Sequence, residues 1–155
     1  MQLRDGVDGD AEAVAGVFFR AVREGALGPY TQAECAAWCG ERPSATQWIR
    51  RTEGLETVVA EMDGQIVGFM TARASDGYID HAFVLPEMRG QGVADAIYAV
   101  VENRARCQKT KRLHTHASHM AKSFFSRHGW IVVSENQVDL AGVQLTNWIM
   151  DKPLS

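Results

Sequence analysis

Residues 89–94 have the composition of an anion-binding turn. They read Arg-Gly-Gln-Gly-Val-Ala, follow a run typical of a strand and open a run with helical spacing. Backbone N–H groups at the start of a helix lack carbonyl partners, and the positive end of the helix dipole lies among them. Gly90 and Gly92 leave the backbone open to an approaching group, and Arg89 adds positive charge. We therefore expect this turn to bind a phosphate or pyrophosphate.

Two better-known phosphate-binding motifs do not fit these residues. A P-loop ends in Gly-Lys-Ser/Thr, and that sequence does not occur here. A dinucleotide-binding fingerprint needs a third small residue where Asp95 stands, directly after the first strand of a βαβ unit. The Gly-x-Gly pair is also common in tight turns that bind nothing, so the residues alone leave that alternative open.

Before this turn, the spacing of apolar residues first favours helices. A short strand near residues 2–4 leads to Asp10, which we expect to cap a helix with its apolar face over residues 14–22. Thr31 and Ser44 are expected to cap two further short helices. The N-terminal third is therefore expected to be mainly helical.

From residue 56 the apolar spacing becomes that of strands. Asp63-Gly64, the strongest short hairpin signal, is expected to join strands over 57–62 and 65–72, and a third strand covers 78–85. Beyond the glycine turn and its helix, the pattern predicts a strand over 113–117, a helix over 120–128 ended by Gly129, and strands over 131–138 and 143–150. This order predicts a mixed α+β sheet rather than a regular βαβ alternation.

Length and composition place the chain among ordinary globular proteins. Its 155 residues, 46% hydrophobic and 23% charged, predict one domain over residues 1–155. A formal net charge of −3 argues against a nucleic-acid partner. No apolar run reaches the ~18 residues of a membrane helix, and the N-terminus resembles no signal or transit peptide. We therefore expect no membrane partner and a cytoplasmic location, in agreement with an odd number of cysteines, three.

The turn and its surroundings resemble the GNAT superfamily of N-acetyltransferases. Residues 89–94 match the signature Q/R-x-x-G-x-G/A. The likeness covers nearly the whole chain and includes the Asp63-Gly64 hairpin, the Val84-x-Pro86 lead-in, Ala117-Ser118 and the helix end Phe124-Phe125-x-x-x-Gly129-Trp130. It implies a GNAT-like mixed, mostly antiparallel sheet of about seven strands, flanked by helices and splayed between the fourth and fifth strands.

The resemblance also implies an acetyl-CoA-dependent N-acetyltransferase that needs no metal. The acceptor would be a primary amine of a small molecule or peptide, attacking the thioester directly in a ternary complex. Loop amides would hold the pyrophosphate, and the N–H of Val84 or Leu85 would polarise the acetyl carbonyl. Members of the superfamily often dimerise, which makes a homodimer a further implication. Contacts with acetyl-CoA are expected at Phe83, Val84, Leu85, Arg89, Gly90, Gln91, Gly92, Val93, Ala94, Ser118 and Phe125.

Acetylation requires a neutral amine, so a base or a water chain must take a proton from the ammonium form. Asp80 stands where many members of the superfamily have an acidic base, and it is equally suited to hold the ammonium group. A solvated carboxylate at a strand end is the simpler alternative. His116 is the second candidate because an imidazole suits base work near pH 7. By strand alternation, His81 is expected to face away from Asp80.

The usual general acid of the superfamily has no counterpart at its expected position. Many members protonate the departing CoA thiolate with a tyrosine, and the matching residue here is Phe125, which has no proton to donate. A free thiol has a pKa of ~8.5, so its thiolate leaves tolerably well without full protonation. Ser118, where relatives often have an asparagine, is expected to bond the pantetheine or relay a water.

Two other patterns of metal-binding or redox type are weaker. His114 and His116 share one strand face but have no acidic or cysteine partner at ligand spacing, so no metal site is expected. Cys35 and Cys39 lie four residues apart, which is not the spacing of a redox pair. We expect them to be small buried hydrophobic residues.

Two features bear on the acceptor and on a rival function. Trp38 and Trp48 are expected in the core, and either is placed to line an acceptor pocket on the N-terminal helices. The phenylalanine at position 125 keeps open a non-catalytic acyl-CoA-binding sensor or interaction module. Release of CoA in the presence of amines distinguishes the enzyme from the sensor.

Overall fold

The computed structural model describes residues 1–154. They form five α-helices, seven strands and two short 3₁₀ turns, Asp8–Asp10 and Pro86–Met88. The longer elements follow the chain in this order: β1 (Gln2–Asp5), α1 (Ala11–Arg23), α2 (Gln32–Cys39), α3 (Ala45–Arg51), β2 (Glu56–Met62), β3 (Gln65–Arg73), β4 (Tyr78–Val84), α4 (Val93–Cys107), β5 (Arg112–Ala117), α5 (His119–Arg127), β6 (Ile131–Leu140) and β7 (Val143–Pro153).

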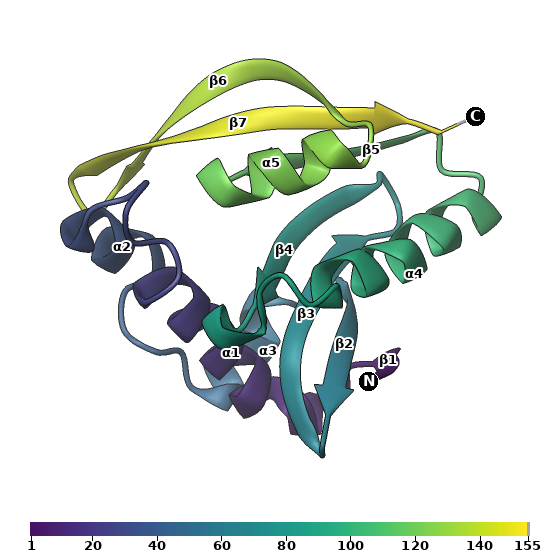
Figure 1. The fold of residues 1–155 in the computed structure, drawn as a ribbon, viewed down its shortest axis with the longest axis horizontal. Coiled ribbons are helices and arrows are strands. Elements are labelled where there is room, and N and C mark those ends of the chain that lie inside the picture. Colours follow the sequence, from purple (N-terminus) through teal and green to yellow (C-terminus); the bar gives the residue numbers. More distant parts are fainter. Residues whose placement is uncertain (155) are drawn as a thin grey trace.

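All seven strands belong to one sheet, in the order β1-β2-β3-β4-β5-β7-β6. Neighbouring strands are antiparallel except β4 and β5, which run parallel and pair only at Tyr78 with His114 and Ile79 with Thr115. Past these two pairs the strands diverge, as Figure 1 shows between the teal β4 and the green β5. The expected α+β sheet, splayed between its fourth and fifth strands, is therefore confirmed.

The closed end of the splay is held by two hydrogen bonds. The Thr115 hydroxyl donates to the carbonyl oxygen of Ile79 at 2.7 Å, and the backbone N–H of His114 donates to the carbonyl oxygen of Gly77 at 3.0 Å. Because β4 and β5 are parallel, both strands open toward their C-terminal ends. The opening therefore lies beside the turn that begins α4.

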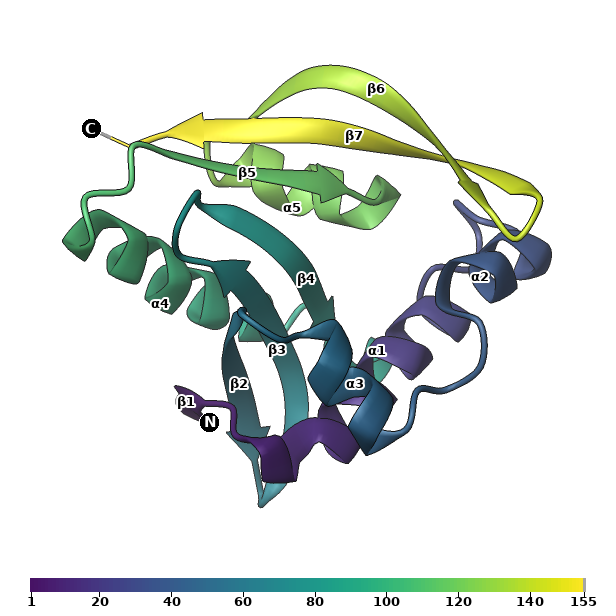
Figure 2. The same ribbon diagram turned by 180° about the vertical axis from the view of Figure 1, so that it is seen from behind.

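Helices cover both faces of the sheet. Figure 2 looks onto α1 and α3, whereas α4 and α5 lie on the opposite side, in front in Figure 1. The apolar stripe of α1 is buried, and Phe18 packs against Trp48 of α3 with ring centroids 5.3 Å apart. On the α4 side, a Cβ at Gly68 would lie 3.0 Å from a methyl carbon of Val93. The missing side chain at Gly68 lets the first turn of α4 sit directly on β3.

Local signals located most helix and turn boundaries. The side chains of Thr31 and Ser44 accept from the backbone N–H three residues ahead, at 3.1 Å each, which confirms both caps. Asp63 and Gly64 both have positive φ (51° and 76°), the conformation of the expected hairpin turn. Gly129 follows α5 with a φ of 86°. The last two strands continue past their expected ends, to residues 140 and 153.

The expected capping role of Asp10 is wrong. Asp10 precedes α1, but its side chain makes no capping hydrogen bond. Both carboxylate oxygens accept instead from the Arg4 guanidinium, at 2.8 and 3.0 Å, and one also accepts from the Val7 N–H. A charge-assisted bidentate pair is stronger than a single hydrogen bond to a helix amide, so the Asp10 carboxylate binds Arg4 of β1 instead of capping the helix.

Within residues 1–154, none of the helices has both the length and the apolar character needed to cross a bilayer.

Candidate active site

The turn before α4 presents unpaired backbone amides. Gly90 and Gly92 have φ values of +77° and +80°, a conformation that side chains with a Cβ rarely adopt. Gly92 is the cap residue of α4 and has no side chain to bond the first amides of the helix. The N–H of Ala96 donates to the Gly92 carbonyl at 3.0 Å and starts the helical ladder. The backbone N–H groups of the residues before Ala96 point out of the N-terminal end of the helix, where together with the helix dipole they create a positive potential.

Arg89 points back into the protein rather than out into solvent. Its guanidinium donates to the Gly25 carbonyl oxygen at 2.7 Å, and a Cβ at Gly25 would collide with it. Burial lowers the pKa of Arg89, yet a guanidinium stays protonated near neutrality. The positive charge expected from the sequence is therefore present at the loop, and it also ties the loop to the segment after α1.

Backbone groups of β4 are divided between β3 and the opening. The N–H of Leu85 donates to the Val67 carbonyl at 2.9 Å, so this amide is already used within the sheet. In an antiparallel pair, every second residue of a strand directs its backbone N–H and C=O toward the same neighbouring strand. Phe83 therefore bonds to β3, as Leu85 does, whereas the backbone groups of Ala82 and Val84 point away from β3, toward the splay. Of the two amides expected to meet the acetyl carbonyl, only that of Val84 is turned into the splay.

Two adjoining cavities occupy the splay. The first, here the loop cavity, has a volume of about 520 Å³ and is bounded by residues 88–90 and 92–95, the end of β4 and α5. The second, here the inner cavity, has a volume of about 310 Å³ and is lined by residues of α1, α2, α3, α5, β4, β5, β6 and β7. Both cavities are lined by the same six residues at their junction: Tyr30, Trp38, Ala82, Phe83, Ser118 and Ala121.

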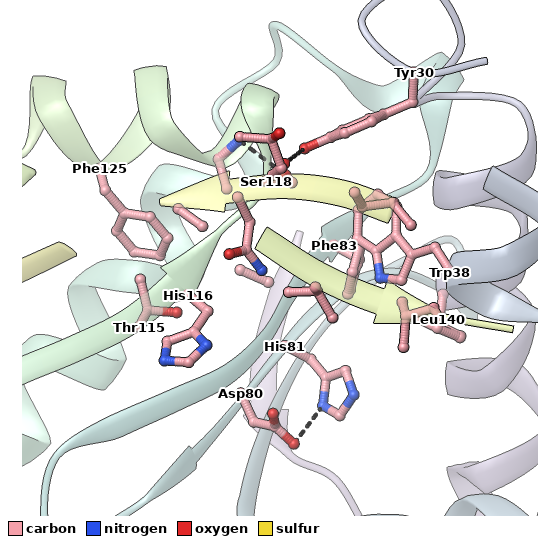
Figure 3. A pocket seen from close by; sticks show the side chains of 18 of the residues that line it. Tyr30, Trp38, Asp80, His81, Phe83, Thr115, His116, Ser118, Phe125 and Leu140 are labelled. Carbon is pink, nitrogen blue, oxygen red and sulfur yellow. Dashed lines mark hydrogen bonds and ion pairs between the residues drawn. The ribbon is translucent and has the colours of Figure 1, made fainter. Parts of the chain in front are cut away.

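A β-bulge places Asp80 and His81 together in the inner cavity. Thr71 of β3 pairs with His81 and Ala72 pairs with Ile79, so Asp80 is an extra residue on β4. The bulge breaks the side-chain alternation, and the expectation that His81 faces away from Asp80 is wrong. Figure 3 shows the two side chains next to each other, with His81 Nδ1 3.5 Å from Asp80 Oδ2.

The imidazole of His81 is held in its neutral form. Burial is the main cause that lowers its pKa; the Asp80 carboxylate opposes the shift, and the positive charge of Arg51 adds to it. His81 Nδ1 also lies 2.7 Å from the Thr71 hydroxyl oxygen. Only 10% of the His81 side chain is exposed, against 34% for Asp80. Asp80 is thus the more accessible of the two.

The other expected site residues line the same cavity from β5 and α5. His116 is exposed at the end of β5, with its ring 5.8 Å from that of Tyr78. Ser118 caps α5 by accepting from the Ala121 N–H at 3.3 Å. Phe125 is buried, its ring 4.4 Å from Trp130, and one face borders the inner cavity (Figure 3).

Three further cavity residues were missed as site residues because their segments lie far from β4 in sequence. Tyr30 donates its hydroxyl to the Thr146 carbonyl at 2.8 Å and accepts from the His119 N–H at 3.0 Å. Burial raises the pKa of Tyr30, so the hydroxyl keeps its proton. Arg51 and Phe18 reach the cavity from α3 and α1. No local motif marks these residues, and only the packing of the N-terminal helices on the sheet brings them here.

The remaining sequence candidates lie in the protein interior or away from a site. Cys35 and Cys39 are buried free thiols whose pKa values are raised by burial, as expected of small core residues. Trp48 is buried in the core, whereas Trp38 lines both cavities. Within the described residues 1–154, no group of three or more His, Cys, Asp or Glu side chains is arranged to hold a metal ion.

A helix start with unpaired amides beside a second, side-chain-lined cavity is typical of an enzyme that holds a phosphate-bearing donor next to its acceptor. The family model "Acetyltransferase (GNAT) domain" matches residues 26–152. The chain is also 30% identical to the uncharacterized N-acetyltransferase YafP of Escherichia coli (strain K12) over 150 residues, 97% of this chain and 94% of YafP. The chain therefore belongs to the GNAT acetyltransferase family and is an acetyl-CoA-dependent acyltransferase.

Solved structures agree with this assignment. A GCN5-related N-acetyltransferase of Rhodopseudomonas palustris superposes with a TM-score of 0.91 at 27% identity, covering 99% of this chain and 95% of that one. The PaiA N-acetyltransferase of Thermoplasma acidophilum, solved in complex with coenzyme A, superposes with a TM-score of 0.77 at 16% identity. That superposition covers 99% of this chain and 98% of the other, and at this identity it shows the shared fold.

Proposed function

We propose that this protein transfers the acetyl group of acetyl-CoA to a primary amine of a small molecule or peptide, by direct attack in a ternary complex. The observation that supports this best is the meeting of the two cavities at Phe83 and Ser118. One cavity ends at the amides of the α4 start, and the other holds Asp80, His81 and His116. Donor and acceptor can therefore occupy the splay together and meet at the junction.

The loop cavity suits acetyl-CoA. Amides of residues 90–94, gathered at the N-terminus of the 15-residue α4, match the charge of a pyrophosphate. The splayed β4 leaves alternate backbone groups for a pantetheine arm to pair with, as an added strand would. The Val84 N–H then serves as the oxyanion donor for the acetyl carbonyl. The Thermoplasma relative of the same fold, solved with coenzyme A, supports this placement.

Asp80 is the residue we assign to the ammonium group of the acceptor. Its carboxylate is the only acidic side chain that lines the inner cavity among residues 1–154. It attracts the cation and accepts a proton from it, directly or through a water. His81 adjoins Asp80 and is neutral near pH 7, so it is a second acceptor for this proton, and His116 is a third at the opposite wall.

The reaction exchanges one bond for another. The neutral amine attacks the carbonyl carbon of the thioester, a C–N bond forms, the C–S bond breaks, and the electron pair leaves with CoA as a thiolate. The proton lost by the amine goes to the Asp80 side of the cavity and on to solvent. Phe125 donates nothing to the thiolate, which leaves unprotonated or takes a proton from water. Ser118, at the junction, is placed to bond the pantetheine or hold that water.

A second function is favoured by one observation. Phe125 replaces the hydroxyl that many relatives use, and a protein that binds acetyl-CoA without turnover has no need of such a donor. In that case the inner cavity would recognise a ligand and report on it, as a sensor does.

Thiol release separates the two functions. Purified protein is mixed with acetyl-CoA and with amines, amino acids, aminoglycosides and peptides, and free CoA thiol is measured. The enzyme predicts release that depends on the acceptor and yields an acetylated product of matching amount. Calorimetric binding of acetyl-CoA without thiol release from any acceptor would instead support the sensor.

A further inference from the structure

We propose that the acceptor is a primary amine that carries a carboxylate, a free amino acid with an apolar body, and that Arg51 binds its carboxylate. This inference rests on the proposed function, because it assigns the second charge of the molecule whose amine meets Asp80. Arg51 and Asp80, two opposite charges in one small cavity, indicate this substrate class.

Arg51 is a positioned cation without a carboxylate partner. It lies in the last turn of α3, and within the described residues no Asp or Glu oxygen comes within 4.0 Å of its guanidinium. The guanidinium carbon lies 5.7 Å from the ring centroids of both Phe18 and Trp48. Two aromatic faces therefore hold the cation in place at the cavity wall while its N–H fork stays available for a planar anion.

The charges of the inner cavity complement a zwitterion. Its lining contains one fixed cation, Arg51, and one carboxylate, Asp80, together with His81 and His116. His81 is neutral at pH 7 because burial lowers its pKa. An amine with a carboxylate would pair both fixed charges, whereas a plain amine would leave the exposed guanidinium of Arg51 paired with water alone.

The rest of the cavity limits the size and polarity of this acceptor. Its volume of about 310 Å³ lies at the lower end of the range for small-molecule sites, so it suits a compact molecule. Aromatic and aliphatic side chains make up much of the wall: Phe18, Tyr30, Trp38, Phe83, Leu140 and Leu145. An apolar side chain on the amino acid would occupy this part.

Two other roles of Arg51 are less consistent with the structure. A basic residue in the last turn of a helix interacts favourably with the helix dipole, but that role requires no cavity and no aromatic support. A phosphate of the cofactor is an alternative anion, but Arg51 lines the inner cavity and not the loop cavity. Acceptor binding is the role that uses its position.

Matched acceptors test the inference. Thiol release is measured with phenylalanine, phenethylamine and phenylalaninamide, and with 6-aminohexanoate and hexylamine, so that two separations of amine and carboxylate are covered. We expect kcat/KM for one of the acids to exceed that of its counterparts that lack the carboxylate by at least about tenfold. Phenylalaninamide has the less basic amine and so the larger neutral fraction, which means that a preference for the acid cannot come from amine ionisation.

Variants of Arg51 then locate the effect. Arg51→Gln should raise KM for the preferred acid and bring its kcat/KM to within about threefold of the amine, while Arg51→Lys keeps part of the preference. Arg50→Gln is the matched control, because this neighbouring arginine is exposed, as Arg51 is, but borders neither the inner nor the loop cavity. It should leave all ratios unchanged.

The contrary outcomes are distinct. Equal kcat/KM for acids and amines, or an Arg51→Gln effect of equal size on both, would overturn the carboxylate site and leave the acetyltransferase intact. Acetyl-CoA binding with no thiol released by either series would overturn the proposed function and the inference with it.

Discussion

The loop cavity and the inner cavity adjoin, but they are built from different parts of the chain. The polar end of the loop cavity is formed mainly by backbone amides of consecutive residues at the start of α4, within 90–94, where Gly90 and Gly92 have positive φ. The polar groups of the inner cavity are side chains from α3, β4, β5 and β7, such as Arg51, Asp80, His116 and Asn147. Backbone amides are the same for every residue type except proline, whereas side chains differ, so we expect the first cavity to define the donor and the second to define the acceptor.

This difference implies that substitutions in one cavity impair the function of that cavity without impairing the other. A substitution in the inner cavity should stop turnover and leave acetyl-CoA affinity in place. A substitution in the turn should remove acetyl-CoA affinity and leave the fold in place. The predictions below test this separation, from the largest expected effect to the smallest.

Asp80→Asn is expected to lower kcat/KM by about 10²–10⁴-fold, because the amide neither accepts the ammonium proton nor attracts the cation. The affinity for acetyl-CoA, measured by calorimetry, should stay within about twofold of wild type. Asp63→Asn is the matched control, since Asn-Gly forms the same hairpin turn as Asp63-Gly64, far from either cavity. Turnover unchanged by Asp80→Asn would remove this residue from the mechanism.

Tyr30→Phe is expected to lower the free energy of unfolding by about 1–3 kcal/mol. It deprives the Thr146 carbonyl of a donor and the His119 N–H of an acceptor at the junction of the two cavities. Urea denaturation gives the value. Tyr78→Phe serves as the control, because the Tyr78 hydroxyl has no hydrogen-bond partner within residues 1–154 and its loss should change stability by a few tenths of a kcal/mol, about the level of a neutral change. Equal effects of the two variants would contradict the bridging role.

His81 should make stability depend on pH. Burial lowers its pKa below the ordinary 6.5, so between these two values the unfolded chain binds more protons than the folded one. The free energy of unfolding is therefore independent of this group above about pH 7 and falls as the pH is lowered from about 6.5, by up to about 1.4 kcal/mol per unit.

Urea denaturation between pH 5.5 and 7.5 measures this dependence. His81→Gln should reduce the slope below pH 6.5, and His119→Gln, at the exposed start of α5, should leave it in place because His81 is intact. Identical slopes for wild type and His81→Gln would show that another titrating group causes the loss of stability below pH 6.5.

Sequence signals succeeded where structure is local. Gly90 and Gly92 indicated a turn at a helix start, Asp63-Gly64 indicated the hairpin, and Thr31 and Ser44 indicated helix caps. In each case the residues that determine the conformation are also those that adopt it. The splay was foreseen only through the resemblance to a family, because no residue pattern states where two parallel strands part.

Sequence signals failed where a residue of another element decides. Asp10 has the residue type of a helix cap, but Arg4 of the neighbouring strand competes for its carboxylate and wins. Strand alternation assigned Asp80 and His81 to opposite faces, and one bulge reversed that. Arg51 carries no motif at all. Its position in the inner cavity depends on how α3 packs on the sheet, which a linear pattern does not contain.

The central claim is that main-chain amides at the α4 start hold the diphosphate of acetyl-CoA, and calorimetric titration of acetyl-CoA tests it most directly. Gly92→Glu places a negative charge beside these amides, Gly92→Ala introduces only the backbone strain, and Gly64→Glu carries the same strain and charge into a remote turn. We predict that Gly92→Glu weakens binding by about 100-fold or more, Gly92→Ala weakens it less, and Gly64→Glu leaves it unchanged. Wild-type affinity in a folded Gly92→Glu protein would contradict the claim.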